Sequence, residues 1–342
     1  MDMDIKQLIF DLCSAHGVSG SEESAVAVAE KYLSDIAEVT TDHNGNLYAV
    51  TGDKTADITI LLDAHIDRIG LIVTDINDNG FVKVDKCGGI DARVLQDTVL
   101  ATENGLRGTV CCLPPHLTNG SEDKAEPISK TWVDFGLPYD EVKKRVNIGD
   151  KLTFCCEPKM LLGDKITAPA LDNRCGAAAL IYTARLLYNK PCPYRVVILL
   201  SSQEETFGTG AITGAYKTEA DEAVSVDVSF ASQPDISGQY ASIGLGKGAM
   251  IGIAPVLNKR MTDKLISLAR DNGIAYQLEP LSGSTGTNAD NISVSRSGVK
   301  TALISIPQRY MHTQAEVICI RDVESVSALI RDYILCGGAF ND

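Results

Sequence analysis

The 342-residue sequence predicts an α/β fold with a mainly parallel central sheet, helices on both faces of that sheet, and an inserted all-β, barrel-like domain. Strand-like and helix-like segments alternate at the start of the chain and again after residue 164, which is typical of a parallel sheet. Residues 69–164 instead contain short strand-like segments between turn signals such as Asn104-Gly105. We therefore expect an α/β domain formed by residues 1–68 and 165–342, with residues 69–164 as the inserted β domain.

Two helices are expected near the start of the chain. Apolar residues recur at helical spacing between residues 3 and 16, and Gly17 suits the position after a helix end. Ser19 and Glu22 have the spacing of a capping box, so they predict a second helix that extends to Leu33.

The remaining elements follow in the order that a sheet with helical crossovers requires. Asn44-Gly45 predicts a hairpin turn between the first two strands. Strands are expected over residues 38–41, 47–51, 57–64, 194–201, 223–228 and 300–306. Helices are expected over residues 172–189, 260–272 and 322–336.

Composition and charge narrow the classes of partner. The formal net charge of −14 argues against nucleic-acid binding, which needs clustered Lys and Arg. No apolar run approaches the roughly 18 residues of a membrane span, and residues 1–17 lack the pattern of a secretory signal. The ten cysteines lack the spacing of a disulfide framework or a zinc ribbon, which favours reduced thiols. We therefore expect a cytoplasmic protein that binds neither nucleic acid nor membrane.

Carboxylate and imidazole side chains gather where the predicted strands end and where one predicted helix begins. The residues are His65, Asp67, Asp172, Glu204, Glu205, Asp227 and His312. Ligands bind open α/β sheets beyond the carboxyl ends of the strands, so these groups are expected at one edge. Their carboxylates would repel one another unless cations lay between them. Mixed nitrogen and oxygen ligands favour a pair of Zn or Co ions, or Mn, over Ca or Mg.

Each of these residues has a simpler explanation when taken alone. A histidine at a strand end is usually hydrogen-bonded for structure, and Asp172 has the position of a helix N-cap. Glu204 and Glu205 alone would be solvated residues at the start of a loop. Asp67 would form an ion pair with Arg68. The convergence of several such groups favours the metal site.

The local spacing divides the roles further. Glu204 and Glu205 are adjacent in extended chain and therefore point to opposite sides, so one can bind metal while the other faces a substrate and moves a proton. His65 and Asp67 are two residues apart and face the same way. Asp67 can therefore accept a hydrogen bond from the ring nitrogen of His65 that does not bind metal.

Five collinear segments surround these residues: 63–70 (DAHIDRIG), 170–174 (ALDNR), 203–205 (QEE), 226–228 (VDV) and 309–312 (RYMH). In this order they resemble the M42 family of metallo-aminopeptidases, which includes glutamyl and deblocking aminopeptidases and proteins once labelled endoglucanases. The resemblance covers nearly the whole chain. It implies a zinc-exopeptidase-like fold and hydrolysis of N-terminal residues from short peptides.

The resemblance also implies which residues bind the metal ions. His65 and Asp227 would be terminal ligands of one ion. Glu205 and His312 would hold the other, and Asp172 would bridge the two.

Further roles follow from the same resemblance. Glu204 would be the general base, and Asp67 would orient His65. The β domain would serve subunit contact in a homo-oligomer, with dimers assembling into a tetrahedral dodecamer that admits only short peptides.

The sequence departs from the family pattern at Asn288, where the family often has Asp, and at Phe230, where it often has His. A third departure is Thr209, where Arg is common. None of these removes an expected metal ligand, but together they make the substrate pocket an open question.

Two other functions are kept as alternatives. A glycoside hydrolase would need two carboxylates on either side of a sugar, and the two histidines would have no role in it. A catalytically weak assembly protein would keep a decayed site, against which the intact Glu204 argues.

Overall fold

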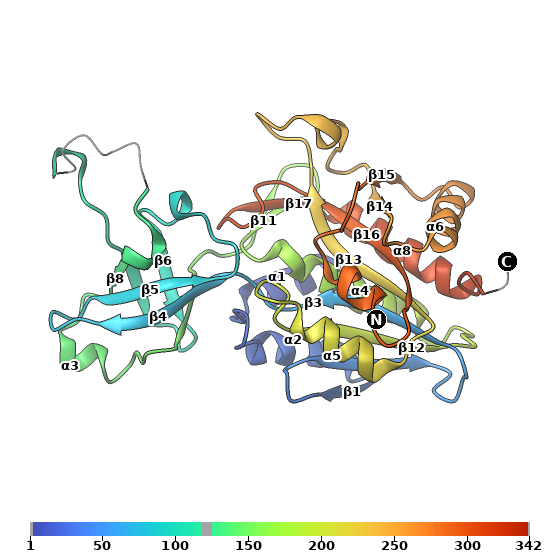
Figure 1. Cartoon of the computed structure of the whole chain (residues 1–342), viewed down its shortest axis with the longest axis horizontal. Coiled ribbons are helices and arrows are strands. Elements are labelled where there is room, and N and C mark those ends of the chain that lie inside the picture. Colours follow the sequence, from blue (N-terminus) through green and yellow to red (C-terminus); the bar gives the residue numbers. More distant parts are fainter. Residues whose placement is uncertain (1–2, 118–124, 341–342) are drawn as a thin grey trace.

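The computed structural model describes residues 3–117 and 125–340, and it consists of an α/β body and a smaller barrel beside it (Figure 1). The central sheet has the strand order β1-β2-β12-β3-β13-β16-β14-β15. Its strands are β1 (Glu38–Thr41), β2 (Leu47–Gly52), β3 (Thr59–His65), β12 (Arg195–Ser201), β13 (Glu222–Phe230), β14 (Ala249–Ile253), β15 (Tyr276–Pro280) and β16 (Lys300–Gln308).

The four central strands β12, β3, β13 and β16 run parallel to one another. β3 is buried at every position from Thr59 to His65, as expected for a strand covered on both faces. Strands β14 and β15 were not predicted, and β14 runs antiparallel to β16. The predicted mainly parallel sheet is confirmed in its centre, and antiparallel pairs lie toward both edges.

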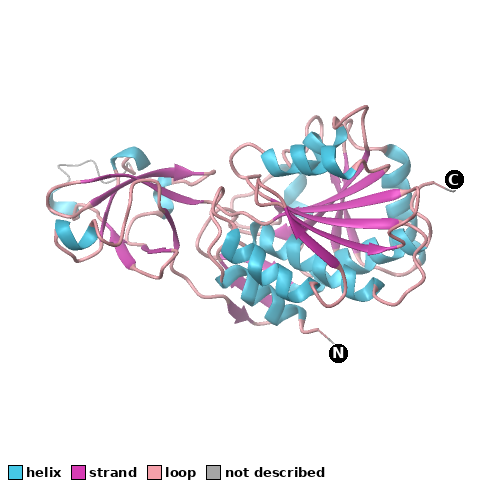
Figure 2. Cartoon of the chain, turned by 90° about the horizontal axis from the view of Figure 1, so that it is seen from below, coloured by secondary structure: helices cyan, strands magenta, loops and turns pink. Residues whose placement is uncertain are grey.

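Helices cover both faces of the sheet (Figure 2). The core on one face includes side chains of α1 (Ile5–Ser14), α2 (Glu23–Leu33), α4 (Leu171–Leu187), α6 (Lys259–Asp271) and α8 (Ile320–Leu335). The core on the other face includes side chains of α5 (Thr209–Thr218) and α7 (Asn288–Ser293), two helices absent from the predicted set.

The caps predicted for the first two helices were wrong. α1 ends at Ser14, three residues before Gly17, and Ala15 is its C-cap. Glu22 precedes α2 without a side-chain cap bond. The Ser19 hydroxyl instead donates a hydrogen bond to Asp67, and the Glu22 carboxylate accepts from backbone N–H groups. The two side chains of the apparent capping box therefore serve tertiary contacts.

The barrel is closed, with the strand order β4-β5-β8-β7-β6-β9. Its strands are β4 (Gly70–Ile76), β5 (Val82–Cys87), β6 (Val99–Thr102), β7 (Arg107–Val110), β8 (Trp132–Asp134) and β9 (Lys151–Phe154). A one-turn helix, α3 (Tyr139–Val142), packs on it, and the barrel has an apolar core of its own, separate from those of the α/β body.

Strands β10 (Lys159–Leu161) and β11 (Lys165–Ala168) follow the barrel and lead into α4. They form a small antiparallel sheet with β17 (Glu316–Cys319), which directly precedes α8. All ten cysteines are free thiols. Within the described ranges, no helix has the length and apolar character needed to cross a membrane.

Candidate metal centre

The sheet register brings the predicted residues to one edge. His65 ends β3, and its register partner on β12 is Ser201, so Glu204 and Glu205 begin at the same level. Ser225 on β13 pairs with Asp63 on β3, which places Asp227, two residues further along, level with His65. The carboxyl ends of parallel strands share one edge, and this register brings the side chains together there.

One group of possible ligands consists of His65, Asp172 and Asp227, whose ligand atoms all lie within 4.8 Å of one another. Nε2 of His65 is 3.1 Å from Oδ1 of Asp172 and 3.7 Å from Oδ1 of Asp227. All three side chains are buried.

A second group consists of Asp172, Glu205 and His312, again with ligand atoms within 4.8 Å of one another. Nε2 of His312 is 3.1 Å from Oδ2 of Asp172 and 3.3 Å from Oε2 of Glu205. Asp172 therefore belongs to both groups, with Oδ1 toward His65 and Oδ2 toward His312.

The donor set fits divalent metal ions. Ligand atoms about 2.0–2.2 Å from a zinc ion lie some 3–4 Å from one another, the range found in both groups. Oε1 of Glu205 is buried and has no hydrogen-bond partner in the described structure. Imidazole nitrogens and carboxylate oxygens are ligands that suit Zn, Co or Mn.

Asp172 does not cap the helix that follows it. In the described ranges no backbone N–H of α4 donates to its carboxylate, and its two oxygens instead face the ring nitrogens of His65 and His312. The backbone N–H of Asp172 donates to Oε2 of Glu316, 3.1 Å away. The N-cap explanation for Asp172 is therefore wrong.

The tautomer of His312 is set by the segment 69–164. Nδ1 of His312 lies 2.9 Å from the carbonyl oxygen of Gly89. A carbonyl can only accept, so Nδ1 carries the proton and Nε2 keeps its lone pair for a metal ion.

Asp67 connects several parts of the site. Its Oδ1 lies 3.3 Å from Nδ1 of His65. The backbone N–H groups of Glu204 and Glu205 donate to its two oxygens over 3.0 and 3.2 Å, and Ser19 donates to Oδ2. In the described ranges Asp67 forms no ion pair with Arg68, the alternative that the sequence left open.

A sequence profile described as M42 glutamyl aminopeptidase matches residues 45–329. The chain belongs to the M42 family. A lysyl aminopeptidase of Pyrococcus furiosus is 32% identical over 336 residues, which cover 95% of each chain.

Solved structures of peptidases share the fold. An aminopeptidase of the archaeon Desulfurococcus kamchatkensis superposes with a TM-score of 0.90 at 30% identity, over 98% of this chain and 95% of the other. The TET1 peptidase of Pyrococcus horikoshii, which can assemble into a tetrahedron or a large octahedral shell, has a TM-score of 0.86 at 28% identity, over 97% and 99% of the two chains. These likenesses support an aminopeptidase function.

Sequence reasoning missed two carboxylates that support the candidate site. Glu316 accepts from the backbone N–H groups of Asp172 and, over 2.9 Å, His312. Glu22 accepts from the N–H of Gln203, the residue before the glutamate pair, over 3.2 Å. The position of Glu316, four residues after His312, was the available signal; nothing local distinguishes Glu22 from a helix cap.

The carboxylates of the site are hard to ionise together. Burial raises the pKa of Glu204 to about 8, and the charges of Asp227 and Glu205 add to this effect. Burial and the charge of Asp172 raise the pKa of Glu205 to about 7. Burial also opposes ionisation of Asp172, but hydrogen bonds from His312 and His65 outweigh it and lower its pKa. The site as a whole therefore favours added positive charge.

A pocket of about 260 Å³ opens onto these residues. Glu204, Glu205 and Asp227 line it together with Phe230, which is 45% exposed. Of the three departures from the family pattern, Phe230 is the one that lines this pocket. Asn288 is buried behind it and donates to Ser201 over 2.9 Å.

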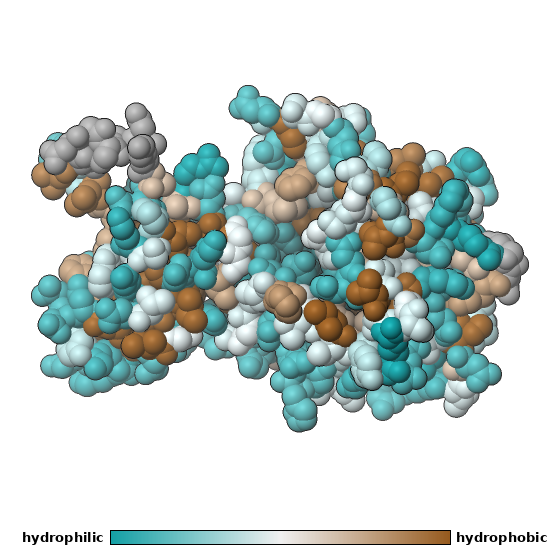
Figure 3. Space-filling view, viewed as in Figure 1, coloured by the Kyte–Doolittle hydropathy of each residue, from teal (hydrophilic) through white to brown (hydrophobic). Residues whose placement is uncertain are grey.

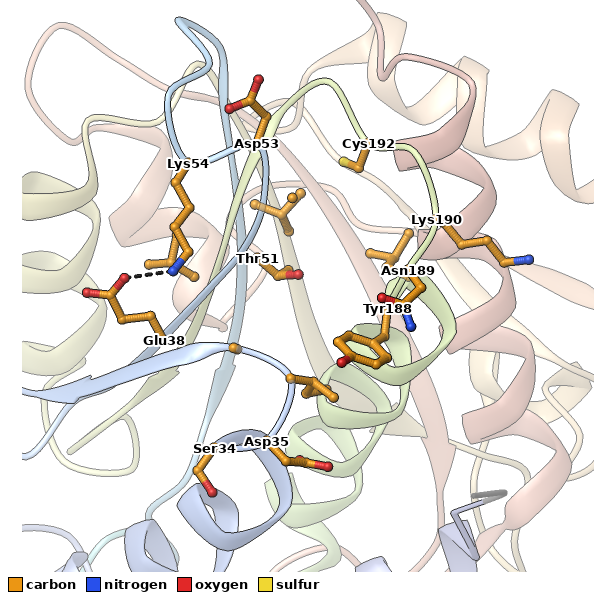
Figure 4. Close-up of a pocket in the computed structure, with 16 residues that line it drawn as sticks. Ser34, Asp35, Glu38, Thr51, Asp53, Lys54, Tyr188, Asn189, Lys190 and Cys192 are labelled. Atoms are coloured by element: carbon orange, nitrogen blue, oxygen red, sulfur yellow. Dashed lines mark hydrogen bonds and ion pairs between the residues drawn. The ribbon is translucent and has the colours of Figure 1, made fainter.

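A second hollow, of about 610 Å³, lies at the opposite edge of the sheet, between the end of α2, the end of β2 and the turn after α4 (Figure 4). Its rim carries the ion pair of Lys54 with Glu38, at 2.8 Å. None of the candidate metal ligands lines it, so its larger volume does not make it the functional site.

Proposed function

We propose that this M42 peptidase is a metallo-aminopeptidase that removes N-terminal residues from short peptides with a dinuclear metal centre. The observation that carries the proposal is the position of Asp172, whose two oxygens face His65 and His312 separately over 3.1 Å each. Asp227 completes one ligand group and Glu205 the other.

When bound, two divalent ions would polarise the scissile carbonyl and lower the pKa of an attacking water. Glu204 is the general base in this proposal, because it lines the pocket and belongs to neither ligand group. It takes the proton of the attacking water and passes it to the leaving amine.

Asp67 acts through His65. The 3.3 Å contact of its Oδ1 with Nδ1 directs Nε2 of that ring toward Asp172 and Asp227. Asp67 also accepts hydrogen bonds from the backbone N–H groups of Glu204 and Glu205. These hydrogen bonds fix the loop that carries the general base. Asp67 is therefore a positioning residue.

The carboxylate-rich pocket also supports cleavage at the chain end. A free α-amino group is a cation, and it finds negative partners beside the ligand groups. An internal peptide bond lacks that group, so release of single N-terminal residues is the expected activity. The relatives carry both glutamyl and lysyl in their names, so the preferred residue must be argued from this pocket.

Homo-oligomerisation is part of the proposal, and the tetrahedral or octahedral assembly of the TET1 peptidase supports it. Hydrophobic side chains reach the surface of both the barrel and the α/β body (Figure 3). Examples are Leu113 and Ile148 on the barrel, and Phe207 and Tyr216 on the body. Dimers that build a tetrahedral dodecamer are the expected state.

The test is a set of aminoacyl-anilide substrates with protein depleted by EDTA and reloaded with Zn, Co or Mn. The proposal expects two bound ions per chain by elemental analysis, loss of activity with EDTA and recovery on reloading. A glycoside hydrolase would keep its activity in EDTA, and an assembly protein would release no N-terminal residue from any substrate.

A further inference from the structure

A carboxylate without an assigned role lines the floor of the pocket. Glu279 on β15 is 3% exposed, and its carboxylate accepts hydrogen bonds from the hydroxyls of Ser229 and, over 2.8 Å, Ser305. It belongs to neither metal-ligand group. Its carboxylate is nevertheless part of the pocket wall that faces those groups.

The sheet register explains how Glu279 reaches this position. Glu279 on β15 is the register partner of Gly252 on β14. Because Gly252 has no side chain, the side chain of Glu279 can extend across β14 toward Ser305 on β16. Ser305 is in turn the register partner of Asp227 on β13, and Ser229 follows Asp227 by two residues. The Glu279 carboxylate therefore contacts the two serines next to Asp227, its register partner Ser305 and Ser229 two residues further along.

In the part of the chain that the structure describes, no cationic side chain balances the charge of Glu279. Among residues 3–117 and 125–340, no Lys, Arg or His forms an ion pair with it. Two hydroxyl bonds leave part of the acceptor capacity of a carboxylate unused. Burial raises the pKa of Glu279, the expected effect of a carboxylate held without a cation. A cationic ligand group would relieve this cost.

Part of the pocket wall is apolar or aromatic. Phe230, Tyr240, Leu281 and Leu303 line the same pocket, and the rings of Phe230 and Tyr240 meet edge to face with centroids 5.2 Å apart. A side chain that suits this shape has an apolar stem and a positive end. Lysine has a four-carbon stem and an ammonium group, whereas a glutamate side chain would meet Glu279 with like charge.

We propose that Glu279 makes a basic N-terminal residue such as lysine the preferred substrate of this chain. The stem of that residue packs between Phe230, Tyr240 and Leu281, and its ammonium group pairs with Glu279 while the α-amino group stays beside the metal ligands. This inference rests on the proposed aminopeptidase function and adds its substrate class. Acidic N-terminal residues are excluded by the same carboxylate.

The experiment compares kcat/KM of the metal-loaded enzyme for the p-nitroanilides of lysine, norleucine and glutamate. Norleucine has the stem of lysine without its charge. The expected order is lysine, norleucine, glutamate. Glu279→Gln lowers the lysine-to-norleucine ratio at least tenfold, Glu279→Asp retains part of the preference, and the exposed control Asp271→Asn leaves the ratio unchanged.

Two results would overturn the inference. One is a wild-type enzyme that prefers norleucine or glutamate. The other is a lysine-to-norleucine ratio unchanged in Glu279→Gln, where equal losses on both substrates would indicate a structural role. Calorimetric binding of free L-lysine and L-norleucine provides a readout without turnover. L-lysine binds more tightly only if the inference holds, and Glu279→Gln removes the difference. A wild-type enzyme that releases no residue from any anilide contradicts the proposed aminopeptidase function itself.

Discussion

Nδ1 of His312 lies 2.9 Å from the carbonyl oxygen of Gly89, so a backbone group of the segment between β5 and β6 sets the orientation of a proposed metal ligand more than 200 residues later in the chain. A methyl group at Gly89 would come within 2.9 Å of the same Nδ1. The segment between β5 and β6 therefore contributes a backbone group to the proposed site.

We expect Gly89→Ala to push the His312 ring away and to weaken binding of one ion. Loss of a group that orients a ligand typically costs 10–100-fold in metal affinity. The measurement is metal titration of EDTA-treated protein. Gly283→Ala is the control, because a methyl group there meets no atom within 4 Å. Equal affinities in the two variants would contradict the orienting role of Gly89.

The hydrogen bond from Ser19 to Asp67 provides a second test of residues that support the proposed site without binding metal. The hydroxyl of Ser19 bonds Asp67, and both side chains are buried. Ser19→Ala leaves one oxygen of a buried carboxylate short of a donor, which costs about 1–3 kcal/mol of unfolding free energy. We expect lower thermal stability and a lower kcat in Ser19→Ala. Ser21→Ala, which loses only a bond to the carbonyl of Gly20, should match the wild type in both measurements.

The residues at the strand ends could be predicted from the sequence because parallel strands bring their carboxyl ends to one edge. His65 and Asp67 were paired by the two-residue period of extended chain, and the structure has this contact. Ser19 could not be placed, because its partner is 48 residues away and its spacing to Glu22 matches a helix cap. Local pattern fixes which way a side chain points, but only the assembled sheet fixes what it meets.

Strand β15 was missed for the same reason, because local sequence does not show what a side chain meets in the assembled sheet. Its sequence, Tyr276–Pro280, alternates little in polarity, and Glu279 is the one of its five residues that is buried. From the sequence alone, a glutamate in a short edge strand is predicted to be solvent-exposed, because the residues that pack around it in the fold are not known. The most informative residue of the pocket was thus the least visible in the sequence.

Asp322, which is not among the proposed metal ligands, leads to a prediction of how the stability of the protein depends on pH. Its carboxylate accepts from the N–H groups of Gly246 and Gly248, and burial raises its pKa to about 6. The unfolded value is about 3.9, so between these two values the folded state binds more protons than the unfolded state. The contribution of Asp322 to stability is therefore fully present below about pH 4 and is lost as the pH rises toward 6.

The measurement is denaturant unfolding of EDTA-treated wild type and Asp322→Asn between pH 4 and 7. We expect the wild type to lose about 2–3 kcal/mol relative to the variant over this range, because a pKa difference of one between the folded and unfolded states corresponds to about 1.4 kcal/mol. A difference between the two proteins that stays constant with pH would show that Asp322 does not titrate in this window.

Glu204→Gln separates proton transfer from metal binding. Glu204 lines the pocket but belongs to neither ligand group, so the variant should still bind two ions per chain by elemental analysis. Loss of a general base typically lowers kcat by 10²–10⁴-fold, and the variant should fall in that range on every anilide substrate. His312→Ala is the contrasting variant, since it removes a proposed ligand and should lower the metal content as well. If Glu204→Gln kept the wild-type kcat, Glu204 would not be the base. If it lost an ion, its carboxylate would have to be counted among the ligands.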